Sequence, residues 1–240
     1  MAQLPDWRPL SGAAPSLPDA GGAGRVVVVV ASEQAVAEGW AASAALDLAR
    51  SWSRSGQRVI LIDGALQQPT LHQAAGVPNR EGLTDATLFG ASVGRVSQAI
   101  DDGAFFLISA GTVVADTNTV VRSARWHRLS SGMAEAGVTV ALYVRDGESG
   151  TAAFLGSASD IVVLAAKGER APNAVRDLEP LVRAVTGPAV GAEKQGGAVE
   201  GARGPKPTTG GVGRMVGFVV VAAGGAAALG FLLVNLLGGG

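Results

Sequence analysis

The stretch that decides the fold is RVVVVVASEQAVAEGWAASAALDLAR, residues 25–50. It begins with a run of apolar residues, passes through a loop and continues into a segment rich in alanine. A strand that is apolar at successive positions is typical of the centre of a parallel sheet, because helices cover both of its faces. We therefore expect a strand over 26–30 and a helix over 38–53.

Further strands and helices alternate along the chain after this first unit. Strands are expected at 59–63, 104–109, 137–144 and 160–166, and helices at 119–136 and 172–185. Such alternation is typical of a doubly wound α/β fold with a mainly parallel sheet. The sequence thus predicts an α/β domain over residues 25–190.

The composition favours one globular domain and excludes several classes of function. The chain has 240 residues, of which 48% are apolar and 16% charged, and this balance fits a packed core. A net charge of −1 with scattered basic residues does not favour nucleic acid as a partner. Cysteine is absent, so disulfides and thiol chemistry are excluded. The two histidines, His72 and His127, are far apart in the sequence, and we expect no metal site.

Two segments rich in glycine and proline flank the predicted domain. Residues 1–24 show no helical or strand period and are interpreted as an extended N-terminal arm, which Trp7 is suited to anchor. Residues 191–214 have a similar composition and are interpreted as a flexible linker. We expect this linker to connect the domain to a membrane anchor.

That anchor is predicted over residues 215–237, MVGFVVVAAGGAAALGFLLVNLL, which contain no charge. As a helix the segment is about 35 Å long, enough to cross a hydrocarbon core of about 30 Å. A buried core helix is the alternative, but apolarity on every face argues against it. Arg203, Lys206 and Arg214 precede the segment, so the positive-inside rule places the N-terminal domain in the cytoplasm. We therefore expect a single-pass, tail-anchored protein in the lipid bilayer.

Small residues recur within the predicted membrane helix. They are Ala222, Gly224, Gly225, Ala226 and Gly230. Such residues let two helices approach closely, so this face favours packing against another membrane helix. A simple anchor without specific contacts is the alternative interpretation.

The segment VILIDGALQQPTLHQAAGVPNREGLTDATLFG, residues 59–90, carries a specific pattern. It contains LID, L-x-x-P, LH, G-x-P-N, and GL followed by threonine and aspartate. This pattern resembles the bacterial tyrosine kinases of capsule and exopolysaccharide export, within the MinD/ParA group of deviant Walker ATPases. The resemblance covers about residues 25–186. It implies a P-loop NTPase-like fold of the SIMIBI type and a bacterial inner-membrane location.

The chain departs from this family at the phosphate-binding loop. The family's loop ends G-x-G-K-[ST], and the corresponding residues here are EGWAA, which include Gly39, Trp40 and Ala41. Neither the lysine that contacts the phosphates nor the hydroxyl that contacts magnesium has a counterpart. An indole also occupies volume that phosphate would need.

Some of the family's acidic residues are also missing from this chain. The first aspartate remains as Asp63, but Ala65 replaces the second carboxylate, and Gln67 and Gln68 replace a pair of arginines. The strand that bears the third acidic group in the family offers only Asp146, displaced toward the following loop. Asp63 is interpreted as a cap at the end of its strand, with a general base as the alternative.

These losses remove the basis for phosphoryl transfer. Magnesium, lysine and backbone dipoles around the phosphates supply nearly all of that catalysis, each worth about 10²–10³ in rate. The family also carries a tyrosine-rich tail as its substrate, whereas Tyr143 is the only tyrosine here. We expect no enzyme activity and no cofactor, with Gly39, Trp40, Ala41, Asp63 and Ala65 as vestiges of a nucleotide site.

The sequence leaves three functional hypotheses. The first is a structural or assembly subunit of a bacterial membrane complex, either for polysaccharide export or for photosynthesis or respiration. Its partners would be integral membrane subunits that contact the membrane helix, the arm and the linker. The second is a nucleotide-dependent regulator of exopolysaccharide export. The third is a self-associating membrane scaffold.

Overall fold

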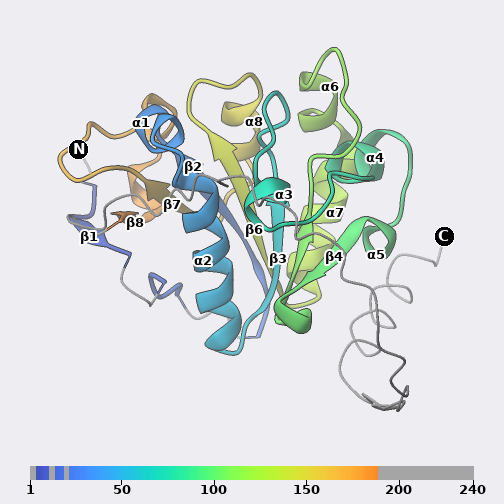
Figure 1. Cartoon of the computed structure of the whole chain (residues 1–240), viewed down its shortest axis with the longest axis horizontal. Coiled ribbons are helices and arrows are strands. Elements are labelled where there is room, and N and C mark those ends of the chain that lie inside the picture. The colour runs from blue at the N-terminus through green and yellow to red at the C-terminus, as the bar shows by residue number, and fades with distance from the viewer. Residues whose placement is uncertain (1–3, 11–13, 19–21, 189–240) are drawn as a thin grey trace, which may run out of the picture.

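The computed structural model describes residues 4–10, 14–18 and 22–188, and these residues form an α/β layered domain (Figure 1). Their strands make one eight-stranded sheet in the order β1-β8-β7-β2-β6-β3-β5-β4. The strands are β1 (Trp7–Pro9), β2 (Arg25–Ala31), β3 (Arg58–Asp63), β4 (Ser97–Ile100), β5 (Phe105–Ile108), β6 (Val138–Arg145), β7 (Asp160–Leu164) and β8 (Val182–Gly187). The helices are α1 (Glu33–Ala37), α2 (Ala41–Arg54), α3 (Leu71–Ala74), α4 (Leu83–Leu88), α5 (Val93–Val96), α6 (Asn118–Val121), α7 (Ala124–Glu135) and α8 (Thr151–Leu155).

The sheet is parallel except at one edge, where β4 pairs antiparallel to β5. The valine run of β2 lies at its centre, between β6 and β7. Val26, Val28 and Val30 face the layer that contains α4 to α8, and Val27 and Val29 face α1 to α3. Successive side chains of a strand point to opposite faces, so an uninterrupted apolar run is needed to fill both layers. The predicted doubly wound architecture is confirmed.

The prediction of a helix over residues 172–185 is wrong. Residues 172–185 form two short 3₁₀ helices, Asn173–Val175 and Glu179–Leu181, followed by β8, which pairs in parallel with β7. Pro172 and Pro180 interrupt any continuous helix there, because proline lacks the amide donor and clashes with the preceding turn. The β-branched residues of β8 then suit a strand that pairs on both sides, with β7 and β1.

Two other parts of the pattern differ from the sequence expectation. The stretch 119–136 contains two helices, α6 and α7, rather than one. Ser123 separates them: its backbone is extended, and its side chain accepts a hydrogen bond from the amide of Arg125 at 3.2 Å. Serine in this position starts a new helix because it satisfies a free amide of the first turn. Strand β4 was not predicted from the sequence.

The described part of the N-terminal arm packs on the domain. β1 extends the sheet by pairing in parallel with β8, Trp7 opposite Val185. The Trp7 indole donates to the carbonyl of Ala165 at 2.8 Å, and the Trp52 indole of α2 donates to the carbonyl of Pro15 at 2.9 Å. Leu10, Ala14 and Leu17 cover part of the layer that contains α2. The described part of the arm therefore adds an edge strand to the sheet and covers part of the layer that contains α2.

The predicted linker and membrane helix lie outside the described residues. This holds for residues 191–214, for residues 215–237 and for the small residues Ala222 to Gly230. Within the ranges 4–10, 14–18 and 22–188, no helix is long and apolar enough to span a bilayer. The membrane anchor stays a prediction.

Candidate functional site

The residues predicted as vestiges of a nucleotide site lie at the carboxyl edge of the sheet. Gly39, Trp40 and Ala41 follow β2 and lead into α2, while Asp63 ends β3 and Ala65 follows it. In doubly wound sheets, ligands bind outside the carboxyl ends of the strands. The predicted residues therefore surround the place where the fold would hold a nucleotide.

The loop after β2 is folded as a helix, α1, instead of an open phosphate cradle. Ser32 caps this helix by accepting a hydrogen bond from the amide of Ala35 at 3.1 Å. The amides of Val36, Glu38 and Gly39 donate to carbonyls of the same turn at 2.9–3.1 Å. A phosphate cradle needs successive amides turned toward the ligand. These three amides are already paired within the chain.

A carboxylate also lies in this loop, beside Trp40. The Trp40 indole donates to Oε2 of Glu38 at 2.9 Å, and the side chain of Gln34 donates to Oε1 at 2.8 Å. The hydrogen bond from Gln34, followed by that from Trp40, lowers the pKa of Glu38 below its ordinary value. Glu38 is therefore an anion at neutral pH, and like charges repel a phosphate.

Trp40 occupies the space between α2 and the end of β8. A methyl group built on Gly187 would lie 3.2 Å from Cη2 of the Trp40 ring, so the indole contacts the backbone of β8. The ring is half-buried, and Ala41, the first residue of α2, is buried. The indole thus packs against the protein one residue before Ala41, which stands at the position of the family's lysine.

Asp63 is fully buried and binds the backbone of the next segment. Its carboxylate accepts hydrogen bonds from the amide of Ala65 at 3.2 Å and from that of Leu71, the first residue of α3, at 3.0 Å. Burial raises the pKa of Asp63 to about 7, although these amides favour the charged form. Ala65 is also fully buried. Asp63 therefore stabilises the turn after β3 through these hydrogen bonds. Its side chain has no contact with solvent.

A second group of charged residues follows β6 and was not singled out from the sequence. Arg145 pairs with Glu148 at 3.5 Å and also donates to the side chain of Gln68 at 3.0 Å. Burial raises the pKa of Glu148, and its charge in turn raises the pKa of Asp63. The spacing of Arg145 and Glu148 was visible in the sequence, but their approach to Asp63 depends on the packing of β3 beside β6.

Asp146, the one candidate for the third acidic group, points away from the vestigial site. Its carboxylate accepts hydrogen bonds from the amides of Asn173 and Ala174 at 3.2 and 3.3 Å. Instead, Glu169 reaches the loop after β2 and accepts from the hydroxyl of Ser32 at 2.8 Å. Sequence reasoning missed Glu169, which lies in a loop without a recognisable pattern.

The edge as a whole is unsuited to a nucleotide with magnesium. The amides of Val36, Glu38 and Gly39 are paired within the chain, and the indole of Trp40 precedes α2. The carboxylates of Glu38 and Glu169 add negative charge. In the part of the chain that the structure describes, no three carboxylate or imidazole groups are arranged to hold a metal ion. The geometry is that of a closed surface held by internal hydrogen bonds.

Comparison with solved structures establishes the class of fold. No protein-family model matches the chain, and no curated protein matches it either. The chain is similar to the kinase domain of Escherichia coli tyrosine kinase ETK, with a TM-score of 0.59 and 16% identity over 74% of this chain and 72% of that one. The shared fold is therefore the P-loop NTPase-like α/β fold.

Two further solved structures have a similar fold. The BceF tyrosine kinase domain has a TM-score of 0.54 and 18% identity over 68% of this chain and 69% of that chain. Cobyrinic acid a,c-diamide synthase from Mycobacterium smegmatis, solved with a bound ATP analogue and magnesium, has a TM-score of 0.52 and 16% identity over 68% and 70%. The resemblance to bacterial tyrosine kinases of the deviant Walker class, predicted from residues 59–90, is confirmed as a likeness of fold.

Proposed function

We propose that this chain is a non-catalytic, membrane-anchored subunit that serves bacterial polysaccharide biosynthesis or export. Its α/β domain acts as a docking body on the cytoplasmic side of the inner membrane. The residues 215–237 anchor it and contact integral membrane subunits. The fold shared with bacterial tyrosine kinase domains supports the polysaccharide setting, and the remodelled carboxyl edge supports the absence of catalysis.

The single observation that carries this proposal is the helix α1. Its amides are paired internally, and Glu38 holds a negative charge beside Trp40. Phosphoryl transfer needs several positive or dipolar groups around the phosphates, each worth about 10²–10³ in rate. The loss of the lysine, of the magnesium-binding hydroxyl and of the free amides of α1 leaves no effective catalyst.

A binding measurement tests the absence of catalysis. The purified full chain is titrated with labelled ATP in the presence of Mg²⁺, and we expect no saturation below about 1 mM. Saturable binding in the micromolar range would instead support the second candidate, a nucleotide-dependent regulator of exopolysaccharide export. ATP hydrolysis in the same sample would contradict a non-catalytic role directly.

A co-purification experiment tests whether the chain serves polysaccharide biosynthesis or export. Full-length protein is extracted from its native membrane in mild detergent, and the subunits that remain bound are identified by mass spectrometry. Export-machinery subunits are the expected partners. Co-purification of photosynthetic or respiratory subunits would contradict a role in polysaccharide export. It would still support a structural role in a membrane complex.

The membrane helix is tested with variants of its small residues. Gly224→Leu and Gly225→Leu add bulky side chains to the predicted packing face. They keep another helix from approaching closely and are expected to release the partner subunits. Val221→Leu is a matched control that adds bulk without removing a glycine. Loss of a homo-oligomer, rather than of partner subunits, would favour the self-associating scaffold.

A further inference from the structure

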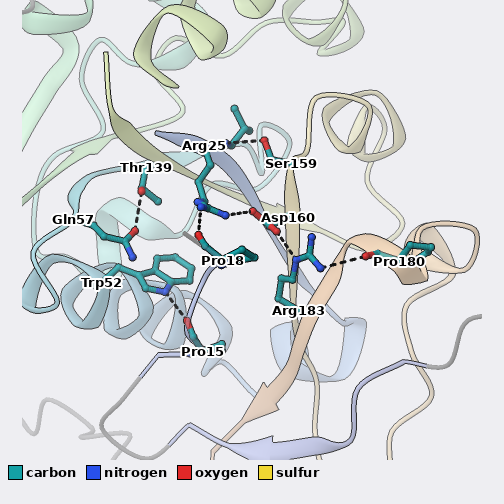
Figure 2. Close-up of polar contacts among 11 residues, drawn as sticks. Pro15, Pro18, Arg25, Trp52, Gln57, Thr139, Ser159, Asp160, Pro180 and Arg183 are labelled. Atoms are coloured by element: carbon teal, nitrogen blue, oxygen red, sulfur yellow. Dashed lines mark hydrogen bonds and ion pairs between the residues drawn. The ribbon is translucent and has the colours of Figure 1, made fainter. Parts of the chain in front are cut away.

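A groove of about 440 Å³ opens at the amino edge of the sheet, at the opposite ends of the strands from the vestigial site. It lies where β2, β3 and β6 begin, and the arm passes beside it. Its walls include Pro18, Arg25, Gln57, Arg58, Gly137 and Thr139. Figure 2 shows Gln57 and Thr139 on one side of Arg25, and Pro18 below it.

Gln57 lines this groove and, within the described part of the chain, has its amide donors free there. The Thr139 hydroxyl donates to Oε1 of Gln57 at 2.8 Å, which uses the carbonyl end of that side chain (Figure 2). Among the described residues, no acceptor lies within hydrogen-bonding distance of the Gln57 amide nitrogen. A primary amide has two N–H donors. Thr139 therefore orients the donor end of Gln57 toward a ligand.

Arg58 adds a positive charge to the same wall. Its side chain is exposed, and its guanidinium donates to the carbonyl of Ala136. It lies against Gly137, which has a φ of +77° and no side chain that would displace it. Among the described residues, Arg58 forms no ion pair. Its charge is thus available to an anion from solution.

Arg25 contributes a second cationic group that is already held in place. Its guanidinium pairs with Asp160 at 2.7 Å and also donates to the carbonyl of Pro18 (Figure 2). Asp160 pairs with Arg183 as well. One carboxylate shared between two arginines leaves a net positive charge behind the groove. No carboxylate belongs to the described walls of the groove.

We infer that this groove binds a phosphate-bearing anion. Donors and positive charge without a carboxylate select an anion, and the planar guanidinium of Arg58 matches two oxygens of a phosphate at once. Phosphate also offers more charge and more acceptor directions than a carboxylate, so it suits donors that approach from Gln57 and from Arg58. The volume lies within the range of small-molecule pockets and leaves room for an organic part beyond the phosphate.

The same chemistry occurs in phosphorylated small molecules and in lipid headgroups, and calorimetry distinguishes the two sources. The full chain in detergent micelles is titrated with inorganic phosphate, with glycerol 3-phosphate and with the short-chain lipid dihexanoyl phosphatidic acid. Saturable binding of inorganic phosphate with a Kd of about 1 mM is expected. Tighter binding of the lipid than of glycerol 3-phosphate assigns a headgroup, and the reverse order or equal binding assigns a free phosphate ester.

Two variants and one control make the inference falsifiable. Arg58→Gln is expected to weaken phosphate binding by about tenfold or more, because it removes the free charge. Gln57→Glu keeps an acceptor for Thr139 but replaces the donors with a negative charge, and it is expected to abolish binding. Arg128→Gln removes an exposed arginine of α7 away from the groove and is expected to have no effect. Circular dichroism confirms that each variant is folded.

Two results would overturn the inference. One is the absence of saturation by all three ligands up to about 10 mM. The other is an equal loss of binding in Arg128→Gln and Arg58→Gln, which would indicate attraction by overall charge rather than by the groove. Either result leaves the proposed docking role intact, because that role depends on the opposite edge of the sheet.

Discussion

The indole nitrogen of Trp40 lies 2.9 Å from a carboxylate oxygen of Glu38, immediately before the first residue of α2. A phosphate-binding loop requires a cation and free amides around this point. Here an indole and an anion satisfy each other. The pair therefore closes the site chemically as well as sterically.

A lysine placed at Trp40, one residue before the position of the family's lysine, is expected to leave the protein unable to bind ATP. In Trp40→Lys the new ammonium lies beside Glu38 and pairs with it, while the amides of Val36 and Gly39 remain bonded within α1. We expect no saturation by MgATP below about 1 mM in equilibrium dialysis. Trp40→Leu serves as the control for the loss of the indole. Micromolar binding by Trp40→Lys would contradict the view that α1 blocks the cradle.

Asp63 is expected to make the protein less stable as the pH rises from about 4 to 7. Its pKa is about 7 in the folded protein, and an aspartate in an unfolded chain titrates near about 3.9. Between these values the folded state binds a proton that the unfolded state lacks. The free energy of unfolding therefore falls with increasing pH, by at most about 1.4 kcal/mol per pH unit, and this contribution levels off above pH 7. Urea denaturation at several pH values measures it.

The variant Asp63→Asn isolates this contribution. An amide cannot titrate, so the stability of the variant is expected to change less between pH 4 and pH 7 than that of the wild type. Burial raises the pKa of Glu148 too, so Glu148→Gln is expected to flatten the profile in the same direction. Parallel profiles for the wild type and Asp63→Asn would show that Asp63 does not titrate in this range.

Removing the Trp7 indole is expected to destabilise the domain by about 2–3 kcal/mol. The indole is half-buried, packs against the core and donates to the carbonyl of Ala165, so Trp7→Ala loses both contacts. Arg8→Ala is the matched control, because Arg8 is the next residue of β1 and is exposed. It is expected to change stability by less than about 0.5 kcal/mol. Equal effects in urea denaturation would mean that the arm contributes no specific contact.

Asp160→Asn is expected to cost about 3 kcal/mol. Asp160 is buried and pairs with Arg25, whose side chain is only 10% exposed, so the substitution leaves the charge of a largely buried arginine without its partner. Glu81→Gln breaks the exposed pair between Glu81 and Arg95, and it is expected to cost less than about 1 kcal/mol. Thermal unfolding of both variants measures the difference. A similar cost in the two would indicate that Asp160 is effectively solvated.

The sequence was sufficient for the class of fold because that information is local. The valine run of β2 is apolar on both faces, and the pattern over 59–90 keeps its spacing, so both are readable without knowing what packs against them. The replacement of the loop residues by Gly39, Trp40 and Ala41 was equally visible. The strand β8 was mistaken for a helix because its pairing with β7 overrides local preference.

The tertiary structure alone decided how the vestigial site is closed and how the arm is used. Sequence spacing did not reveal that α1 pairs the amides of Val36, Glu38 and Gly39. Nor did it reveal that Glu169 binds Ser32, or that β1 extends the sheet beside β8. These features arise from contacts between residues far apart in the chain. The pKa of Asp63 has the same origin, because desolvation depends on what surrounds a group and not on its neighbours in sequence.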